Sequence, residues 1–240
     1  YILSKLVLWP KKLRRELRTR SRVVRNLKRA QKLVQTDTNS DTYFVIGDSH
    51  TDVFSKNTMG AETKMMVNCK FNNGTISGIY ANYHCAPKFV VHHIGAATAY
   101  SSNSRTSVIQ ARRKIDFLIK NHLLPHGARV VLVFGEIDCR VHIQRKSEEQ
   151  NKTISQIIDE TMIKYSELIF DLTKIGYRVT CYGPIATQKG SVPLDESYPR
   201  YKTEKERNQI ADEFNQKLEK LCAANGFGFV TIFDQLHDHY

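Results

Sequence analysis

The chain has 240 residues, of which 41% are hydrophobic and 10% aromatic, and this is enough for one α/β domain with a buried core. No stretch approaches the roughly 18 consecutive apolar residues of a membrane-spanning helix. The formal net charge is +12, but residues 1–41 contain 12 Lys and Arg against 3 Asp and Glu, so they carry +9 of it and leave +3 for the rest. The basic character therefore belongs to the N-terminal segment.

The five cysteines are scattered along the chain, and none forms a CxxC or CxxxC pair. Zinc ligation therefore has little support, and we expect neither a metal nor a cofactor. An odd number of cysteines without a framework spacing is typical of reduced thiols, and no secretory signal peptide is visible, so we expect a cytoplasmic protein. Because the chain starts at Tyr1 rather than Met, we also expect a fragment or a processed product.

Residues 11–34 are predicted to form a basic helix, because apolar residues recur there at three- and four-residue spacings between Arg and Lys. The polar stretch 36–41 is typical of a linker. We therefore expect residues 1–41 to be an arm outside the main core, followed by one domain over residues 42–240. The arm could bind an anionic surface and make the protein membrane-peripheral, but we favour a solvated helix that leads to an upstream domain. Stacking aromatics are absent apart from the nearby Trp9, so no specific nucleic-acid binding is expected.

From Tyr43 onward, short apolar runs alternate with longer amphipathic segments. The runs are rich in β-branched and aromatic residues without strict alternation, which is typical of strands buried on both faces. The strand candidates are residues 43–46, 88–92, 129–134, 177–182 and 227–233. The helix candidates are residues 104–122, 153–175 and 202–224. This alternation predicts an α/β fold of three layers, in which helices cover both faces of a mostly parallel five-stranded sheet.

Residues 55–84 interrupt this alternation. Two stretches there, 65–70 and 75–80, flank Asn72-Asn73-Gly74, and an Asn-Gly pair in such a place predicts a β-hairpin. We expect the hairpin to be inserted near the functional site.

Ligands of open parallel sheets bind beyond the carboxyl ends of the strands, so the residues that follow each strand candidate are the candidates for chemistry. Gly47-Asp48-Ser49-His50 follows the first strand. A glycine lets the chain turn sharply, and the serine can then point into the crevice with its backbone N–H near a developing oxyanion. Asp48 and His50 are candidates for substrate contact. The alternative is that Asp48 or Ser49 only caps a helix.

The second and third strand candidates are also followed by notable residues. Gly95 would allow close backbone approach and offer a second N–H donor, with a plain turn glycine as the alternative. Four ionisable residues follow the third strand: Glu136, Asp138, Arg140 and His142. Charges are costly to bury unless they are paired, so this group indicates a site, with a structural salt bridge as the alternative.

The last strand candidate is followed by Asp234 and His237, three residues apart. A serine nucleophile needs a base, and that base needs an orienting acid, so this pair could serve as acid and base from one loop. A solvated polar tail is the alternative.

Together these blocks resemble those of the SGNH (GDSL-like) hydrolases. That family has Gly-Asp-Ser after the first strand, a lone glycine after the second, Gly-x-Asn-Asp after the third and Asp-x-x-His near the end. By this resemblance Ser49 would be the nucleophile, Gly95 the second oxyanion donor and residues 135–138 the third block, and Phe214-Asn215-x-x-Leu218 also looks like the family. The match covers about residues 43–240. It implies a flavodoxin-like α/β/α fold and a serine esterase or acyltransferase acting on small acyl esters, with acetyl groups on carbohydrate as the first guess.

Two departures from the family pattern matter. Ile137 stands where the family has an oxyanion-hole Asn, and the loss of one such donor typically costs about 10²–10³ in rate, although Arg140 or His142 could substitute. Asp234 also follows the last strand sooner than in the family, so the true acid and base could lie beyond Tyr240. The second hypothesis is therefore a catalytically degenerate domain that binds a glycan or a protein partner.

Overall fold

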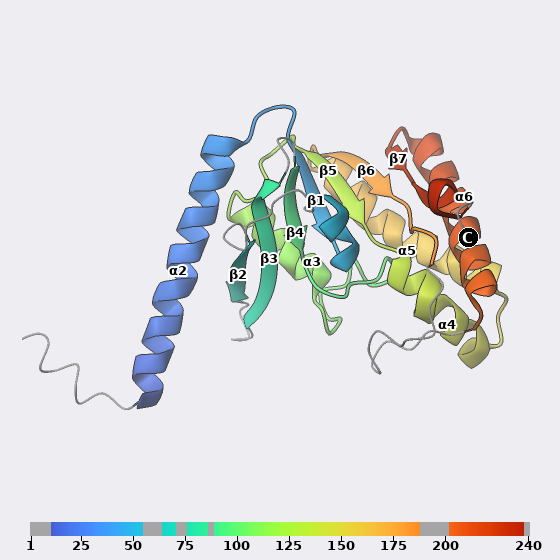
Figure 1. Ribbon diagram of the computed structural model, residues 1–240, viewed down its shortest axis with the longest axis horizontal. Helices are drawn as coiled ribbons and strands as arrows, with labels where there is room; N and C mark the ends of the chain where they lie inside the picture. Colours follow the sequence, from blue (N-terminus) through green and yellow to red (C-terminus); the bar gives the residue numbers. More distant parts are fainter. Residues whose placement is uncertain (1–10, 55–63, 71–75, 86–88, 188–201, 238–240) are drawn as a thin grey trace, which may run out of the picture.

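The computed structural model describes residues 11–54, 64–70, 76–85, 89–187 and 202–237. These residues form a sheet of seven strands in the order β2-β3-β4-β1-β5-β6-β7. The strands are β1 (Tyr43–Gly47), β2 (Lys64–Lys70), β3 (Ile76–Cys85), β4 (Phe89–His93), β5 (Arg129–Val133), β6 (Arg178–Tyr182) and β7 (Gly228–Val230). The helices are α2 (Lys11–Asp37), α3 (Ala111–Lys120), α4 (Ile143–Gln150), α5 (Ile154–Lys174), α6 (Glu204–Asn225) and α7 (Phe233–His237), together with the 3₁₀ helix η2 (Ser49–Phe54) and the π-helix η3 (Asp138–His142) (Figure 1).

Five adjacent strands of the sheet are parallel. β1 pairs with β4 on one side and β5 on the other, β5 pairs with β6, and β6 pairs with β7. The resulting order β4-β1-β5-β6-β7 reverses direction at β1, which is the doubly wound arrangement that opens a crevice at the reversal point. The predicted five-stranded parallel sheet is therefore confirmed.

The two remaining strands extend the sheet beyond β4. β2 pairs antiparallel with β3, and β3 pairs antiparallel with β4. The predicted hairpin strands are thus present at one edge of the sheet, while the Asn72-Asn73-Gly74 turn lies outside the described residues. The hairpin adjoins β4 at the end of the sheet away from β5 and β6.

Both faces of the sheet are covered by helices, in agreement with the predicted three layers. Side chains that alternate along the strands divide between two apolar clusters, with Phe44 and Ile46 of β1 on one face and Val45 on the other. The first face packs against α3, α5 and α6, and the second packs against Phe54 of η2. Figure 1 shows η2 in front of the sheet and α3 and α5 behind it.

The helix boundaries follow local capping chemistry. α5 and α6 each begin after a threonine that forms a capping box, Thr153 with Gln156 and Thr203 with Glu206. The helix predicted over 104–122 starts only at Ala111, because hydroxyls of Ser104 and Ser107 accept backbone N–H groups and hold the preceding residues in turns.

The last predicted strand, 227–233, is shorter than expected. β7 ends at Val230, and the Thr231 hydroxyl accepts the backbone N–H of Phe233, where α7 begins. A threonine oxygen that accepts an N–H two residues ahead is a typical helix start, so the strand stops there.

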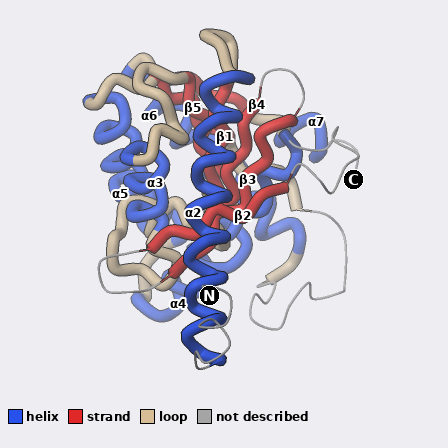
Figure 2. Tube along the Cα trace, turned by 90° about the vertical axis from the view of Figure 1, so that its left-hand side faces the viewer, coloured by secondary structure: helices blue, strands red, loops and turns tan. Residues whose placement is uncertain are grey.

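The expectation that the basic arm lies outside the core is wrong for its C-terminal end. Ala30 and Val34 of α2 are buried in the larger apolar cluster, and Gln31 Nε2 donates to the backbone oxygen of Asn121 at 3.0 Å. α2 contacts β2 and β3 and lies outside the β2 edge of the sheet, as both views show (Figures 1 and 2). None of the described helices has the length and apolarity needed to cross a membrane.

Candidate active site at the carboxyl ends of the parallel strands

The turn after β1 requires a glycine. A β-carbon on Gly47 would lie 2.1 Å from the backbone oxygen of Val133 in β5, which is far inside van der Waals contact. β1 and β5 approach closely here because the backbone N–H of Asp48 donates to that same oxygen. The chain can therefore leave β1 directly into η2, whose first residue is Ser49.

Asp48 is fully buried and organises the turn. Its Oδ1 accepts the backbone N–H of His50 at 2.8 Å, and its backbone oxygen accepts both the N–H and the hydroxyl of Thr51. Asp48 therefore caps η2, as the structural interpretation of this motif expected. Ser49 is exposed between these two anchored residues.

The carboxylate of Asp48 also holds the imidazole of His50. His50 Nδ1 lies 3.1 Å from Asp48 Oδ1 and 3.8 Å from Glu136 Oε2. Burial by itself lowers the pKa of His50, but the hydrogen bond and charge of Asp48 and the charge of Glu136 outweigh burial and the opposing charge of Arg140, so the pKa is raised above 6.5. The ring thus belongs to a charged cluster drawn from the ends of β1 and β5.

Glu136 and Arg140 form an ion pair across η3. Glu136 Oε1 lies 3.0 Å from Arg140 Nε, and the two side chains are only 11% and 12% exposed. A nearly buried pair of this kind is stable only when its partners stay together. This segment therefore contains the structural salt bridge that was the alternative. Glu136 is also part of the candidate site, because it lies near His50.

Asp138 points away from this pair and clamps a neighbouring loop. Its Oδ2 accepts the backbone N–H of Ala99 at 2.6 Å, and its Oδ1 accepts that of Tyr100 at 3.3 Å. Burial raises the pKa of Asp138 to about 6, since the two backbone hydrogen bonds and the charge of Lys146 offset only part of that effect and the charge of Asp48 adds to it.

A small pocket opens at the ends of β1, β5 and β6. One wall is polar and consists of Asp48, His50 and Glu136. The other wall is mostly apolar and includes Tyr182, Pro184 and Ile185. Asp48 Oδ2 is buried and accepts no hydrogen bond within the described part of the chain. Ser49 lies between two lining residues in the sequence but is not itself part of the lining.

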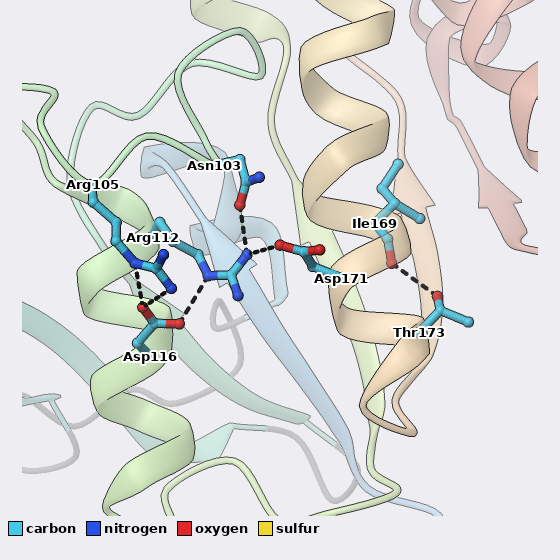
Figure 3. A network of polar contacts seen from close by, with 7 residues as sticks. All are labelled: Asn103, Arg105, Arg112, Asp116, Ile169, Asp171 and Thr173. Atoms are coloured by element: carbon cyan, nitrogen blue, oxygen red, sulfur yellow. Dashed lines mark hydrogen bonds and ion pairs between the residues drawn. The ribbon is translucent and has the colours of Figure 1, made fainter.

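The loop after β4, which carries Gly95, is fixed at several points. Gly95 has φ +101°, a conformation that favours glycine, and the buried amine of Lys114 donates to the oxygen of Ile94 at 2.6 Å. Farther along the loop, Arg112 donates to Asn103 and pairs with Asp171 of α5 (Figure 3). The loop after β4 is therefore fixed by Lys114 and Arg112 of α3, by the contact of Arg112 with α5, and by the hydrogen bonds of Asp138 to Ala99 and Tyr100.

Two residues that follow β5, Ile137 and His142, do not line the pocket. His142 Nδ1 lies 2.8 Å from Arg145 Nη2, and burial, followed by the charges of Arg145 and Lys146, lowers its pKa to about 4. Ile137 is buried, with 3% of its surface exposed, and replaces the amide expected of the family with an apolar side chain.

Of the predicted acid and base, the structure describes the side chain of Asp234 but not that of His237. Asp234 is exposed in the short helix α7, rather than in a loop, and the side chain of His237 is outside the described residues. α7 follows β7, which is three strands away from β1 in the sheet order. The pairing of Asp234 with His237 and its approach to Ser49 therefore stay predictions.

Some residues at the site were not anticipated. Tyr182 ends β6, and Pro184 and Ile185 follow it, so looking at the end of this strand as at the others would have found them. Lys114 gave no such signal, because a lysine in an amphipathic helix normally points to solvent.

Comparison with known proteins identifies no family. No protein-family model matches the chain, and no curated protein matches it at the significance threshold. Among solved structures, phospholipase A1 from Streptomyces albidoflavus shares 12% identity over 80% of this chain and 79% of its own, with a TM-score of 0.37. An extracellular lipase from Streptomyces rimosus shares 14% identity over 80% of each chain, with a TM-score of 0.38. Likenesses this remote assign no activity, so the chemistry has to be inferred from the site itself.

Proposed function

We propose that this chain is a serine esterase or acyltransferase of the SGNH type, with Ser49 as its nucleophile. The observation that carries the proposal is the position of Ser49, exposed at the first residue of η2, directly after β1, where the doubly wound sheet reverses its strand order. Residues at this point face the crevice in which such sheets bind ligands. A hydroxyl placed there can attack a bound carbonyl if a base accepts its proton.

Two backbone N–H groups are suited to stabilise the resulting oxyanion. Those of Ser49 and Gly95 follow adjacent strands, β1 and β4, and neither donates to a turn, loop or cap carbonyl in the described part of the chain. Donors that are fixed before the reaction stabilise developing charge without reorganisation. Arg140 is our candidate for the third donor in place of the missing Asn, and Arg140→Ala should then sharply reduce turnover.

The pocket supports small acyl esters of a hydroxyl-rich alcohol as substrates. The partly exposed imidazole of His50 can exchange hydrogen bonds with hydroxyl groups, while Tyr182 and Pro184 offer apolar surface in the same pocket. A sugar ring presents both kinds of surface, so acetylated carbohydrate is the substrate class that we propose. We expect acetyl esters to be preferred over longer acyl chains, because the pocket is small.

A chromogenic acetyl ester tests the role of Ser49. Ser49→Ala should abolish turnover, whereas Ser166→Ala on α5 should leave it unchanged, because Ser166 bonds only to its own helix. Both variants should keep the native circular dichroism spectrum. Equal turnover in Ser49→Ala and the native chain would reject Ser49 as the nucleophile.

The buried Ile137 favours a second function, a degenerate domain that binds a glycan without catalysis. Its apolar side chain cannot donate to an oxyanion. A serine-directed fluorophosphonate separates the two functions. Failure to label Ser49, together with measurable sugar binding by calorimetry, would favour the binding domain.

A further inference from the structure

We propose that His50, oriented by Asp48, transfers the proton for Ser49. This inference rests on the proposed function and places the base inside the Gly-Asp-Ser-His turn itself. Asp48 is fully buried and its Oδ1 lies 3.1 Å from His50 Nδ1, so the carboxylate fixes the ring and the tautomer that carries hydrogen on Nδ1. The other ring nitrogen, Nε2, is then the basic one.

The arrangement reproduces the acid–base relationship of a catalytic triad with residues from a single turn. In a triad, a buried carboxylate binds one imidazole nitrogen while the other takes the proton of the serine. Because His50 follows Ser49 in the chain and lines the pocket, Nε2 is the ring nitrogen that we assign to take the Ser49 proton, directly or through one water. Asp48 is itself held by the backbone N–H of His50 at 2.8 Å, which makes the pair rigid.

The proposed step is balanced as follows. The Ser49 oxygen forms a bond to the ester carbonyl carbon while its proton passes to His50 Nε2. The carbon–oxygen bond to the alcohol then breaks, and the same proton passes from Nε2 to the departing alkoxide. In the second half, water or an acceptor alcohol gives its proton to Nε2, attacks the acyl group, and Ser49 recovers a proton from His50.

The charges around the ring suit a group that must hold a proton transiently. Asp48 from the end of β1 and Glu136 from the end of β5 favour the imidazolium, and Arg140 opposes it. Glu136 is itself paired with Arg140, so its carboxylate is fixed beside the ring. A developing imidazolium is therefore stabilised by two carboxylates near its Nδ1.

The test measures the rate at which a fluorophosphonate labels Ser49 between pH 5 and 9. In the native chain we expect the rate to rise with pH as His50 loses its proton. His50→Gln should lower the rate by about 10²–10⁴-fold and remove this pH dependence. His126→Gln is the matched control, because His126 precedes β5, at the amino ends of the parallel strands and away from Ser49, and packs on Tyr177.

A second variant guards against misfolding. In His50→Ala, added imidazole should restore part of the labelling rate, which a purely structural defect would not allow. Native-like labelling with an unchanged pH profile in His50→Gln would overturn the role of His50, as would a loss of labelling confined to His237→Gln. Absence of labelling in the native chain would instead overturn the proposed function itself.

Discussion

Asp138 Oδ2 lies 2.6 Å from the backbone nitrogen of Ala99, and this hydrogen bond joins the segment after β5 to the segment after β4. The two segments flank β1 on either side, so the bond spans the point where the strand order reverses. A residue that resembles part of a catalytic block therefore acts here as a clamp between two loops.

The first prediction concerns the pH dependence of stability. The pKa of Asp138 is raised from 3.8 to about 6, chiefly by burial, so the folded chain binds this proton more tightly than the unfolded chain. The stabilisation is complete below about pH 4 and is lost as the pH rises through about 6, with a magnitude of roughly 3 kcal/mol. Urea unfolding from pH 4 to 7 should show this loss in the native chain but not in Asp138→Asn. If the unfolding free energies of the two proteins changed with pH in the same way, this prediction would be wrong.

The second prediction concerns the pKa of His50. Glu136→Gln removes a negative charge 3.8 Å from Nδ1, so the pKa of His50 should fall. The midpoint of the pH profile for Ser49 labelling should move to lower pH. Glu219→Gln, on the exposed side of α6, is the control and should leave the midpoint in place. If the midpoint did not change in Glu136→Gln, the pH profile of labelling would not report the ionisation of His50.

The third prediction concerns the glycine at the end of β1. Gly47→Ala places a β-carbon 2.1 Å from the Val133 oxygen, so β1 and β5 must move apart. We expect a loss of more than about 3 kcal/mol in unfolding free energy, or failure to fold. Gly127→Ala is the comparison, because Gly127 has φ +75° but open space around it, and should cost only about 1–2 kcal/mol. Similar losses in thermal unfolding would show that the contact with Val133 relaxes easily.

The fourth prediction concerns Ile137. Ile137→Asn introduces the residue of the family that the chain resembles and buries an amide at a position that is 3% exposed, so we expect destabilisation of about 1–3 kcal/mol rather than a gain in activity. Ile137→Val should cost about 0.5–1.5 kcal/mol. Differential scanning calorimetry and the acetyl-ester assay together decide the outcome. A more active and equally stable Asn variant would mean that position 137 can reach the oxyanion.

The parallel sheet was predictable because its strands are buried on both faces. The runs that became β1 and β5 are nearly continuous in apolar residues, and β1, β5 and β6 each begin or end within one residue of the predicted strand. The late start of α3 was missed because hydroxyl-to-backbone bonds of Ser104 and Ser107 compete with the helix. Such local competition depends on side-chain geometry, which periodicity does not report.

The site was predictable to the extent that strand ends define it. Asp48, His50 and Glu136 follow β1 and β5 and meet in one pocket. The part played by Asp138 was not predictable, because nothing in the sequence relates it to Ala99, 39 residues away. The partner of Ser49 was also not fixed by pattern alone, since His50 and His237 are both candidates.

The packing of α2 has a consequence for how the chain can be shortened. β2 is the outermost strand, and α2 lies along it with Ala30 and Val34 buried in the main apolar cluster. Removing the helix would uncover this apolar surface and leave the backbone N–H and C=O groups of an edge strand open to pairing with another molecule. A chain that starts at Asp41 should therefore be prone to self-association, because α2 covers the edge of the sheet.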